Sequence, residues 1–143
     1  MYPSLIDSDH ISLISRGGEP SERITARIAA LPPDSVAVSL ISYEEQIRGW
    51  MAEIARIQSV DRQLAAYSRL NRAPDYYCTT LVLPFDEAML AQFQNLWLRR
   101  LRVGTMDLKI AATALASGAT MVTRNTADFG KVLGLKMEDW SGG

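Results

Sequence analysis

Short apolar segments alternate with longer segments of helical periodicity along this chain, and this alternation restricts the fold more than any other feature. Four apolar segments are candidate strands, and they lie at residues 5–6, 36–41, 81–83 and 119–122. The first two are too apolar to be edge strands that face water. Apolar strands that alternate with amphipathic helices are typical of a parallel sheet covered on both faces. We therefore expect an α/β fold.

The segments between these strands predict helices. Apolar residues at helical spacing indicate a consecutive pair of helices over residues 47–57 and 60–70. Asp86 can cap a third, and a fourth over residues 107–117 stops at Gly118, a common helix terminator. No repeat, low-complexity tract or linker divides the chain, so residues 1–143 are expected to form a single domain.

Composition excludes several classes of protein. The 15 Lys and Arg residues against 16 Asp and Glu residues give a net charge of -1, so no global basic field attracts nucleic acid or a membrane. Any contact with nucleic acid must come from a local patch. The single cysteine, Cys78, rules out an internal disulfide and is expected to be buried. The N-terminus resembles neither a signal peptide nor a membrane span, which predicts a cytoplasmic protein without membrane contact.

Four carboxylates lie at or near the ends of the predicted core elements, and they are Asp7, Glu45, Asp107 and Asp128. In an open parallel sheet, the residues just past the carboxyl ends of the strands border the ligand crevice. Four anions in one crevice require a divalent cation. Hard oxygen ligands without a Cys or His cluster favour Mg²⁺, or Mn²⁺ in its place, over zinc. The pattern therefore predicts a magnesium site.

Each acid also has a purely structural explanation. Asp7 can cap the helix that follows it, although Asp9 can serve that role equally well. Glu45 ends the candidate capping box Ser42-Tyr43-Glu44-Glu45. Asp107 would gain about 0.3–1 kcal/mol from the dipole of its helix without any ligand, and Asp128 could satisfy the backbone donors of a polar turn. Singly none is decisive. The only histidine, His10, is expected to be a packing or hydrogen-bonding residue.

The segments that carry these acids match the motifs of a known family. They are Leu5-Ile6-Asp7-Ser8-Asp9-His10-Ile11-Ser12, Val38-Ser39-Leu40-Ile41-Ser42-Tyr43-Glu44-Glu45 and Gly104-Thr105-Met106-Asp107-Leu108-Lys109-Ile110-Ala111-Ala112, with residues 119–123, Asn125, Asp128-Phe129 and Asp139-Trp140 beyond. Over nearly its whole length the chain resembles a PIN-domain ribonuclease, specifically the toxin of a VapC-type toxin–antitoxin pair. The register of the resemblance assigns the catalytic acids to Asp7, Glu45 rather than Glu44, Asp107 and Asp128.

This resemblance implies a PIN-like three-layer α/β/α fold with four or five parallel strands. It also implies Mg²⁺-dependent endonucleolytic cleavage of RNA, homodimerisation and inhibition by a small antitoxin protein. The bound ion would lower the pKa of a water molecule that attacks the phosphodiester, so no nucleophilic side chain is required. Asp7 and Asp107 would hold the ion most directly, with Glu45 and Asp128 completing its shell or orienting water.

Several polar residues near the acids are candidate supporting groups. Thr123 and Asn125 could donate hydrogen bonds to a phosphate or to the carboxylates, or could simply stabilise a turn. Arg102 and Arg124 could contact the phosphates that flank the cut, as could Arg48, Arg99, Arg100 and Lys109. Some of these cations could equally well be solvated at a helix terminus.

Two other functions remain open at this point. Asp7-Ser8-Asp9 after a strand also resembles the Asp-x-Asp of haloacid-dehalogenase-type phosphatases, in which the first Asp accepts a phosphoryl group. That mechanism needs a later Lys and an acidic pair, and no predicted strand end offers a Lys followed by Asp-Asp. The non-enzymatic alternative is a PIN fold that only binds RNA or a partner protein, and the presence of all four acids argues against it.

Overall fold

The computed structural model describes residues 3–78 and 80–142, with the side chains of residues 73–78 outside the described part. Five strands form one parallel sheet in the order β3-β2-β1-β4-β5. They are β1 (Ser4–Ile6), β2 (Val36–Ser39), β3 (Leu81–Leu83), β4 (Thr120–Val122) and β5 (Met137–Glu138). The predicted α/β fold with a parallel sheet is confirmed. The predicted burial of Cys78 falls outside the described side chains.

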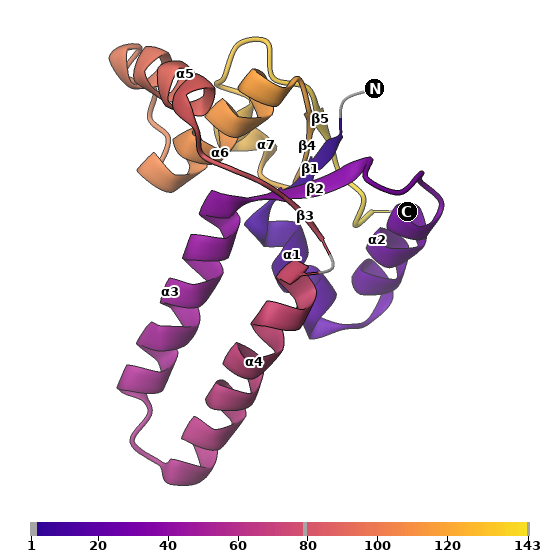
Figure 1. Cartoon of the computed structure of the whole chain (residues 1–143), viewed down its shortest axis with the longest axis vertical. Coiled ribbons are helices and arrows are strands. Elements are labelled where there is room, and N and C mark those ends of the chain that lie inside the picture. Colours follow the sequence, from indigo (N-terminus) through magenta and orange to yellow (C-terminus); the bar gives the residue numbers. More distant parts are fainter. Residues whose placement is uncertain (1–2, 79, 143) are drawn as a thin grey trace.

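Helices cover both faces of this sheet (Figure 1). They are α1 (Ser8–Arg16), α2 (Glu19–Ala29), α3 (Leu40–Arg56), α4 (Val60–Cys78), α5 (Glu87–Leu98), α6 (Thr105–Ser117) and the short α7 (Thr126–Phe129). Leu5 and Met121 pack with α6 on one face, because successive strand residues point to opposite faces. Their neighbours Ile6 and Val122 pack with α1 and α2 on the other. The result is a three-layer α/β/α arrangement.

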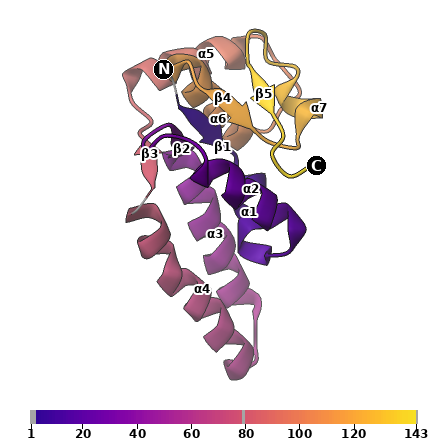
Figure 2. The ribbon, with the colours of Figure 1, turned by 90° about the vertical axis from the view of Figure 1, so that its right-hand side faces the viewer.

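The α3–α4 pair forms an arm that projects from the body of the molecule (Figures 1 and 2). The predicted pair of helices is therefore confirmed. Along α3, the described side chains that are fully buried are Ile41 and Ser42, both at the end nearest the sheet. Farther out, Glu53 of α3 accepts hydrogen bonds of 2.9 and 3.1 Å from Arg69 of α4. The arm is thus held to the body at its base, and its two helices are tied to each other.

The helix boundaries show which capping signals operate. Asp86 caps α5 and Gly118 ends α6 in the left-handed conformation, as predicted. The capping box over residues 42–45 was a wrong prediction. Ser39 caps α3 instead, because its hydroxyl accepts the backbone N–H of Ile41 at 3.0 Å and β2 ends there. The strand is therefore two residues shorter than expected, and Glu45 lies within the helix.

No helix in the described ranges is both long enough and apolar enough to cross a membrane.

Candidate functional site

The four predicted acids lie at the carboxyl-terminal edge of the sheet or beside it. Asp7 directly follows β1, Glu45 lies in the second turn of α3 after β2, and Asp128 is in α7 after β4. Asp107 is in the first turn of α6. Because parallel strands share one carboxyl edge, this is the region where open α/β sheets bind ligands. The topology brings together four acids that are far apart in the sequence.

Asp7 is the most constrained of these acids. It is 4% exposed, and its two carboxylate oxygens accept hydrogen bonds of 2.8 Å, Oδ1 from the backbone N–H of Ser8 and Oδ2 from the hydroxyl of Thr123. Burial raises the pKa of Asp7 to about 6, with a further contribution from the charge of Asp107, although the bond from Thr123 opposes the rise. Asp7 is also the N-cap of α1, so its structural and its proposed functional roles coexist.

Asp9 does not share the capping role that its position suggested. Its carboxylate instead binds Arg124, with Nε–Oδ2 at 3.0 Å and Nη2–Oδ1 at 2.6 Å. The expectation that Asp9 caps the helix equally well was therefore wrong. The physical reason is that Asp7 has the extended backbone of an N-cap, whereas Asp9 already lies inside the first turn of α1.

Glu45 reaches the same region from the arm. Its Oε1 accepts a 2.9 Å hydrogen bond from the hydroxyl of Ser8. Burial raises the pKa of Glu45, and the negative charge of Asp107 adds to the rise. The neighbouring Glu44 instead forms a 2.7 Å ion pair with Arg48. These contacts favour Glu45 over Glu44 as the acid of the site.

Asp107 interacts electrostatically with all three of the other acids. Its charge raises the pKa of both Asp7 and Glu45, while burial and the charge of Asp128 raise its own pKa. Within the described ranges no donor forms a hydrogen bond to the Asp107 carboxylate. The site therefore concentrates negative charge around Asp107, and a cation there would lower the energy of all four ionised acids.

The donor set suits a hard divalent cation in its chemistry, because every candidate ligand is a carboxylate oxygen. In the part of the chain that the structure describes, however, no three Asp, Glu, His or Cys side chains are grouped closely enough to bind one metal ion as they stand. A cation at this site must therefore draw the carboxylates inward or be held partly through its own water ligands, as Mg²⁺ commonly is.

The polar segment after β4 supports two of the acids. The hydroxyl of Thr123 binds Asp7, and its oxygen also accepts the backbone N–H of Asn125 at 2.9 Å. The Asn125 amide donates to Asp128 at 3.2 Å and caps α7. Both residues therefore bind carboxylates and stabilise the turn, so the two explanations offered by the sequence hold together. Lys131 also donates to Asp128, at 3.4 Å.

Ser8 is a supporting residue that the sequence analysis missed. Its backbone N–H binds Asp7 and its hydroxyl binds Glu45, so one residue connects two acids from different elements. The only signal in the sequence is its position immediately after Asp7. That position becomes informative only when α3 is known to pass beside α1.

The predicted cations divide into paired and unpaired groups. The ion pairs of Arg48 with Glu44 and of Arg124 with Asp9 engage both guanidinium groups. Arg102 is exposed, and its backbone carbonyl accepts a 2.9 Å hydrogen bond from Lys131.

His10 is fully buried, and its Nε2 accepts the backbone N–H of Trp140 at 3.1 Å. The prediction that His10 serves packing and hydrogen bonding is confirmed.

Comparisons with known proteins agree with this architecture. The model of the PIN domain family matches residues 5–133. The chain is 26% identical over 116 residues to Ribonuclease VapC1 of Haemophilus influenzae, with 78% of each chain covered. Among solved structures, VapBC-1 from nontypeable Haemophilus influenzae has a TM-score of 0.73 at 23% identity and covers 97% of this chain and 98% of its own. A toxin–antitoxin complex from Klebsiella pneumoniae has a TM-score of 0.67 at 21% identity, with 92% and 94% covered.

Proposed function

Because the chain belongs to the PIN domain family, we propose that it is a Mg²⁺-dependent endoribonuclease that acts as the toxin of a toxin–antitoxin module. The observation that carries the proposal is the gathering of four carboxylates at one edge of the sheet, where burial and the charges of neighbouring acids raise the pKa values of Asp7, Glu45 and Asp107. A cluster of this kind is expensive to keep in a fold unless it binds a cation. The relative named Ribonuclease VapC1 supports the choice of RNA as the substrate.

In this mechanism, Asp7 and Asp107 would hold the ion most directly, and Glu45 and Asp128 would complete its shell or orient water. When bound, Mg²⁺ or Mn²⁺ would supply an activated water and stabilise charge on the phosphate. The protein orients the ligands: Ser8 fixes one oxygen each of Asp7 and Glu45, and Thr123 fixes the other oxygen of Asp7. These bonds restrict the orientations of Asp7 and Glu45, although the carboxylates must still move inward or bind the ion through water.

The proposal extends to partners and domain organisation. Residues 1–143 act as a single PIN-like domain that forms a homodimer and is inhibited by a small antitoxin protein. The likeness to a toxin–antitoxin complex and to VapBC-1 supports a protein partner. Expression with the neighbouring short reading frame tests this point, because the product of that frame should copurify with the chain. A chain that is harmless when overproduced alone would contradict the toxin assignment.

Cleavage of single-stranded or loop-containing RNA by the purified protein tests the activity itself. EDTA should abolish cleavage, and Mg²⁺ or Mn²⁺ should restore it. Asp107→Asn, purified in parallel, should cleave at least about 10–100-fold more slowly, which separates the protein's own activity from that of a contaminating nuclease. Cleavage that survives chelation contradicts the metal mechanism. A wild-type protein that binds RNA but never cleaves it would favour the alternative of a non-catalytic PIN module.

The phosphatase alternative is disfavoured by the environment of Asp7. A phosphoryl acceptor must present a free carboxylate oxygen to its substrate. Asp7 is 4% exposed, and both of its oxygens accept hydrogen bonds. Attack on a phosphate needs an oxygen exposed to that large group, whereas a small metal ion needs only the lone pair that remains on an oxygen accepting one hydrogen bond.

A further inference from the structure

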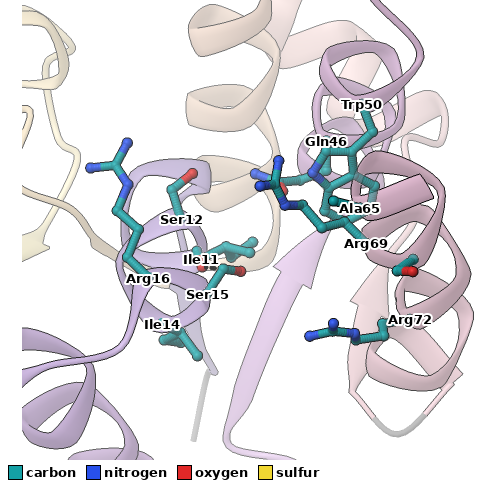
Figure 3. A pocket seen from close by; sticks show the side chains of 11 residues that line it. Ile11, Ser12, Ile14, Ser15, Arg16, Gln46, Trp50, Ala65, Arg69 and Arg72 are labelled. Atoms are coloured by element: carbon teal, nitrogen blue, oxygen red, sulfur yellow. Dashed lines mark hydrogen bonds between the residues drawn. The ribbon is translucent and has the colours of Figure 1, made fainter. Parts of the chain in front are cut away.

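A cleft of about 890 Å³ separates α1 from the α3–α4 arm (Figure 3). We call it the arm cleft. Its walls come from α1 between Ile11 and Arg16, from Gln46 and Trp50 of α3, and from α4 between Ala65 and Arg72. In Figure 3, Arg69 and Arg72 reach from α4 toward α1. The four carboxylates of the candidate site do not line this cleft.

The arm cleft begins where the candidate site ends. The 2.9 Å hydrogen bond from Ser8 to Glu45 joins α1 to α3 at the edge of the site. Ser12 lies one helical turn beyond Ser8, and Gln46 directly follows Glu45, and both line the cleft. The arm cleft therefore adjoins the candidate site along α1 and α3.

The charge of the cleft is opposite to that of the site. Three arginines line it, and none of its described lining residues is an Asp or a Glu. Arg69 forms an ion pair with Glu53, with Nη1–Oε1 at 2.9 Å. Arg16 and Arg72 form no ion pair with any side chain in the described ranges, in contrast to Arg48 and Arg124. The arm cleft therefore holds uncompensated positive charge beside four acids.

An aromatic side chain accompanies these cations. Trp50 is partly buried in the α3 wall, on the same side as Gln46 (Figure 3). Grooves that bind single-stranded nucleic acid combine positive charge along the backbone with aromatic rings on which bases stack. The arm cleft has both components. A polyanion that is repelled by the carboxylate cluster also needs a compensating attraction nearby.

We propose that the arm cleft binds the single-stranded RNA next to the cleaved bond, with Arg16 and Arg72 contacting phosphates and Trp50 stacking on a base. The proposal rests on the proposed ribonuclease function and names the surface that holds its substrate. An acidic segment of a partner protein has similar chemistry. RNA is favoured because the positively charged cleft adjoins the candidate site, and the strand on one side of a cut must leave the site in some direction.

Titration of a fluorescent single-stranded RNA in EDTA, at several salt concentrations, tests the arginines. Arg16→Gln/Arg72→Gln should weaken binding and reduce the slope of log K against log salt by about 1.4, since each phosphate contact on a single strand contributes about 0.7. The control is Arg56→Gln/Arg62→Gln. It removes the same charge from exposed residues of the arm that do not line the cleft, and it should leave the slope nearly unchanged.

Tryptophan fluorescence tests the stacking contact independently. RNA should quench the wild-type emission, and Trp50→Phe should remove most of that quenching. Trp97→Phe, which replaces a 57% exposed tryptophan on α5, should preserve it. Circular dichroism melting of each variant identifies any that fails to fold, and Trp50→Phe keeps an aromatic ring in the wall.

The outcomes separate this proposal from the proposed function. A wild-type protein that cleaves RNA, with equal salt slopes for the two double variants, overturns the arm cleft and leaves the ribonuclease intact. Loss of a copurifying partner protein from Arg16→Gln/Arg72→Gln, with RNA binding unchanged, makes the cleft a protein-docking site and also overturns the proposal. A wild-type protein that neither binds nor cleaves RNA overturns both.

Discussion

The hydroxyl of Thr123 donates a 2.8 Å hydrogen bond to Oδ2 of Asp7, across a sequence separation of 116 residues. Thr123 follows β4 and Asp7 follows β1, and the two strands are neighbours in the sheet. The bond is buried and stabilises the ionised form of Asp7, so it lowers a pKa that burial alone would raise further. Asp7 is therefore held both in position and in its charged state by the adjacent strand.

Replacing Thr123 with Val should remove this donor while keeping the shape of the side chain. The pKa of Asp7 in the metal-free protein then rises further, and the acidic limb of the pH profile for cleavage moves to higher pH. We also expect a stability loss of about 1–3 kcal/mol, because the buried carboxylate loses a partner. Thr123→Ser keeps the hydroxyl and should restore the wild-type pH profile. An unchanged profile in Thr123→Val would contradict this role.

The raised pKa of Asp7 predicts an unusual pH dependence for the metal-free protein. The folded state binds this proton more tightly than the unfolded chain, so stability falls as the pH rises from 3.8 to about 6. The contribution is on the order of 2–3 kcal/mol. Glu45 and Asp107, whose pKa values are also raised, act in the same direction. Asp9 and Asp139 act oppositely, but only below their ordinary range, because their pKa values are lowered.

Asp7→Asn should remove most of this dependence. Urea unfolding in EDTA at pH 4 and pH 7 measures it, and the variant should be more stable than the wild type at pH 7. Its hydrogen bonds can persist, because an amide oxygen accepts as a carboxylate does and the Thr123 hydroxyl can accept as well as donate. Equal pH dependence in the two proteins would remove Asp7 as the source.

Asp107→Asn separates a metal ligand from a residue that only stabilises a helix end. If Asp107 is a metal ligand, Asp107→Asn should lower the rate of cleavage by at least about 10–100-fold, because it removes a charge that binds the ion. The variant should also raise the melting temperature of the metal-free protein, because it relieves the repulsion with Asp7, Glu45 and Asp128.

The matched control for Asp107→Asn is Glu87→Gln. Glu87 is an exposed acid in the first turn of α5, where the dipole of the helix acts in the same way. That change should cost at most about 1 kcal/mol of stability and leave activity intact. Equal cleavage by the two variants, with Asp107→Asn the less stable in EDTA, would reject the metal assignment.

The Asp9–Arg124 ion pair should affect cleavage indirectly, by positioning neighbouring residues of the candidate site. Asp7 and Asn125 adjoin the site, so the pair fixes α1 against the segment after β4. We expect Asp9→Asn, Arg124→Gln and the double variant each to lower cleavage several-fold and by the same factor, since all three break one connection. If the loss of cleavage in the double variant were instead the product of the losses in the two single variants, Arg124 would have a separate function such as contacting a phosphate.

Local patterns predicted β1 to β4 and several of the helices, whereas β5 and α7 were not predicted. The first, third and fourth apolar segments, the Asp86 cap and the Gly118 terminator are decided within a few residues and were located to within one residue, while the second segment was two residues too long. The start of α3 was not, because Ser39 and Ser42 are both acceptable caps and only the end of β2 pairing selects Ser39. Helix α2 was not predicted, and its only fully buried residue in the described part is Ile24.

The candidate site was predictable as a set of acids but not as a network. The positions of the acids follow from strand ends, which are local features. The bonds from Thr123 to Asp7, Ser8 to Glu45 and Arg124 to Asp9 span 116, 37 and 115 residues, and no local pattern contains that information. For the same reason, the sequence does not show whether an arginine side chain forms an ion pair. Arg124 was therefore a candidate for RNA binding, while Arg16 and Arg72 were overlooked.

Glu45 stands at the boundary between the fixed and the free part of α3. The last fully buried side chain of that helix in the described ranges is Ser42, and from there the helix continues without a break to Arg56 at the far end of the arm. Asp7, Asp107 and Asp128 belong to the body of the molecule, whereas Glu45 lies on α3, about one turn beyond its last buried side chain. Any tilt of the arm therefore changes the distance from one carboxylate to the other three, and the capacity of the site to hold a cation depends on the angle of a helix that extends far outside it.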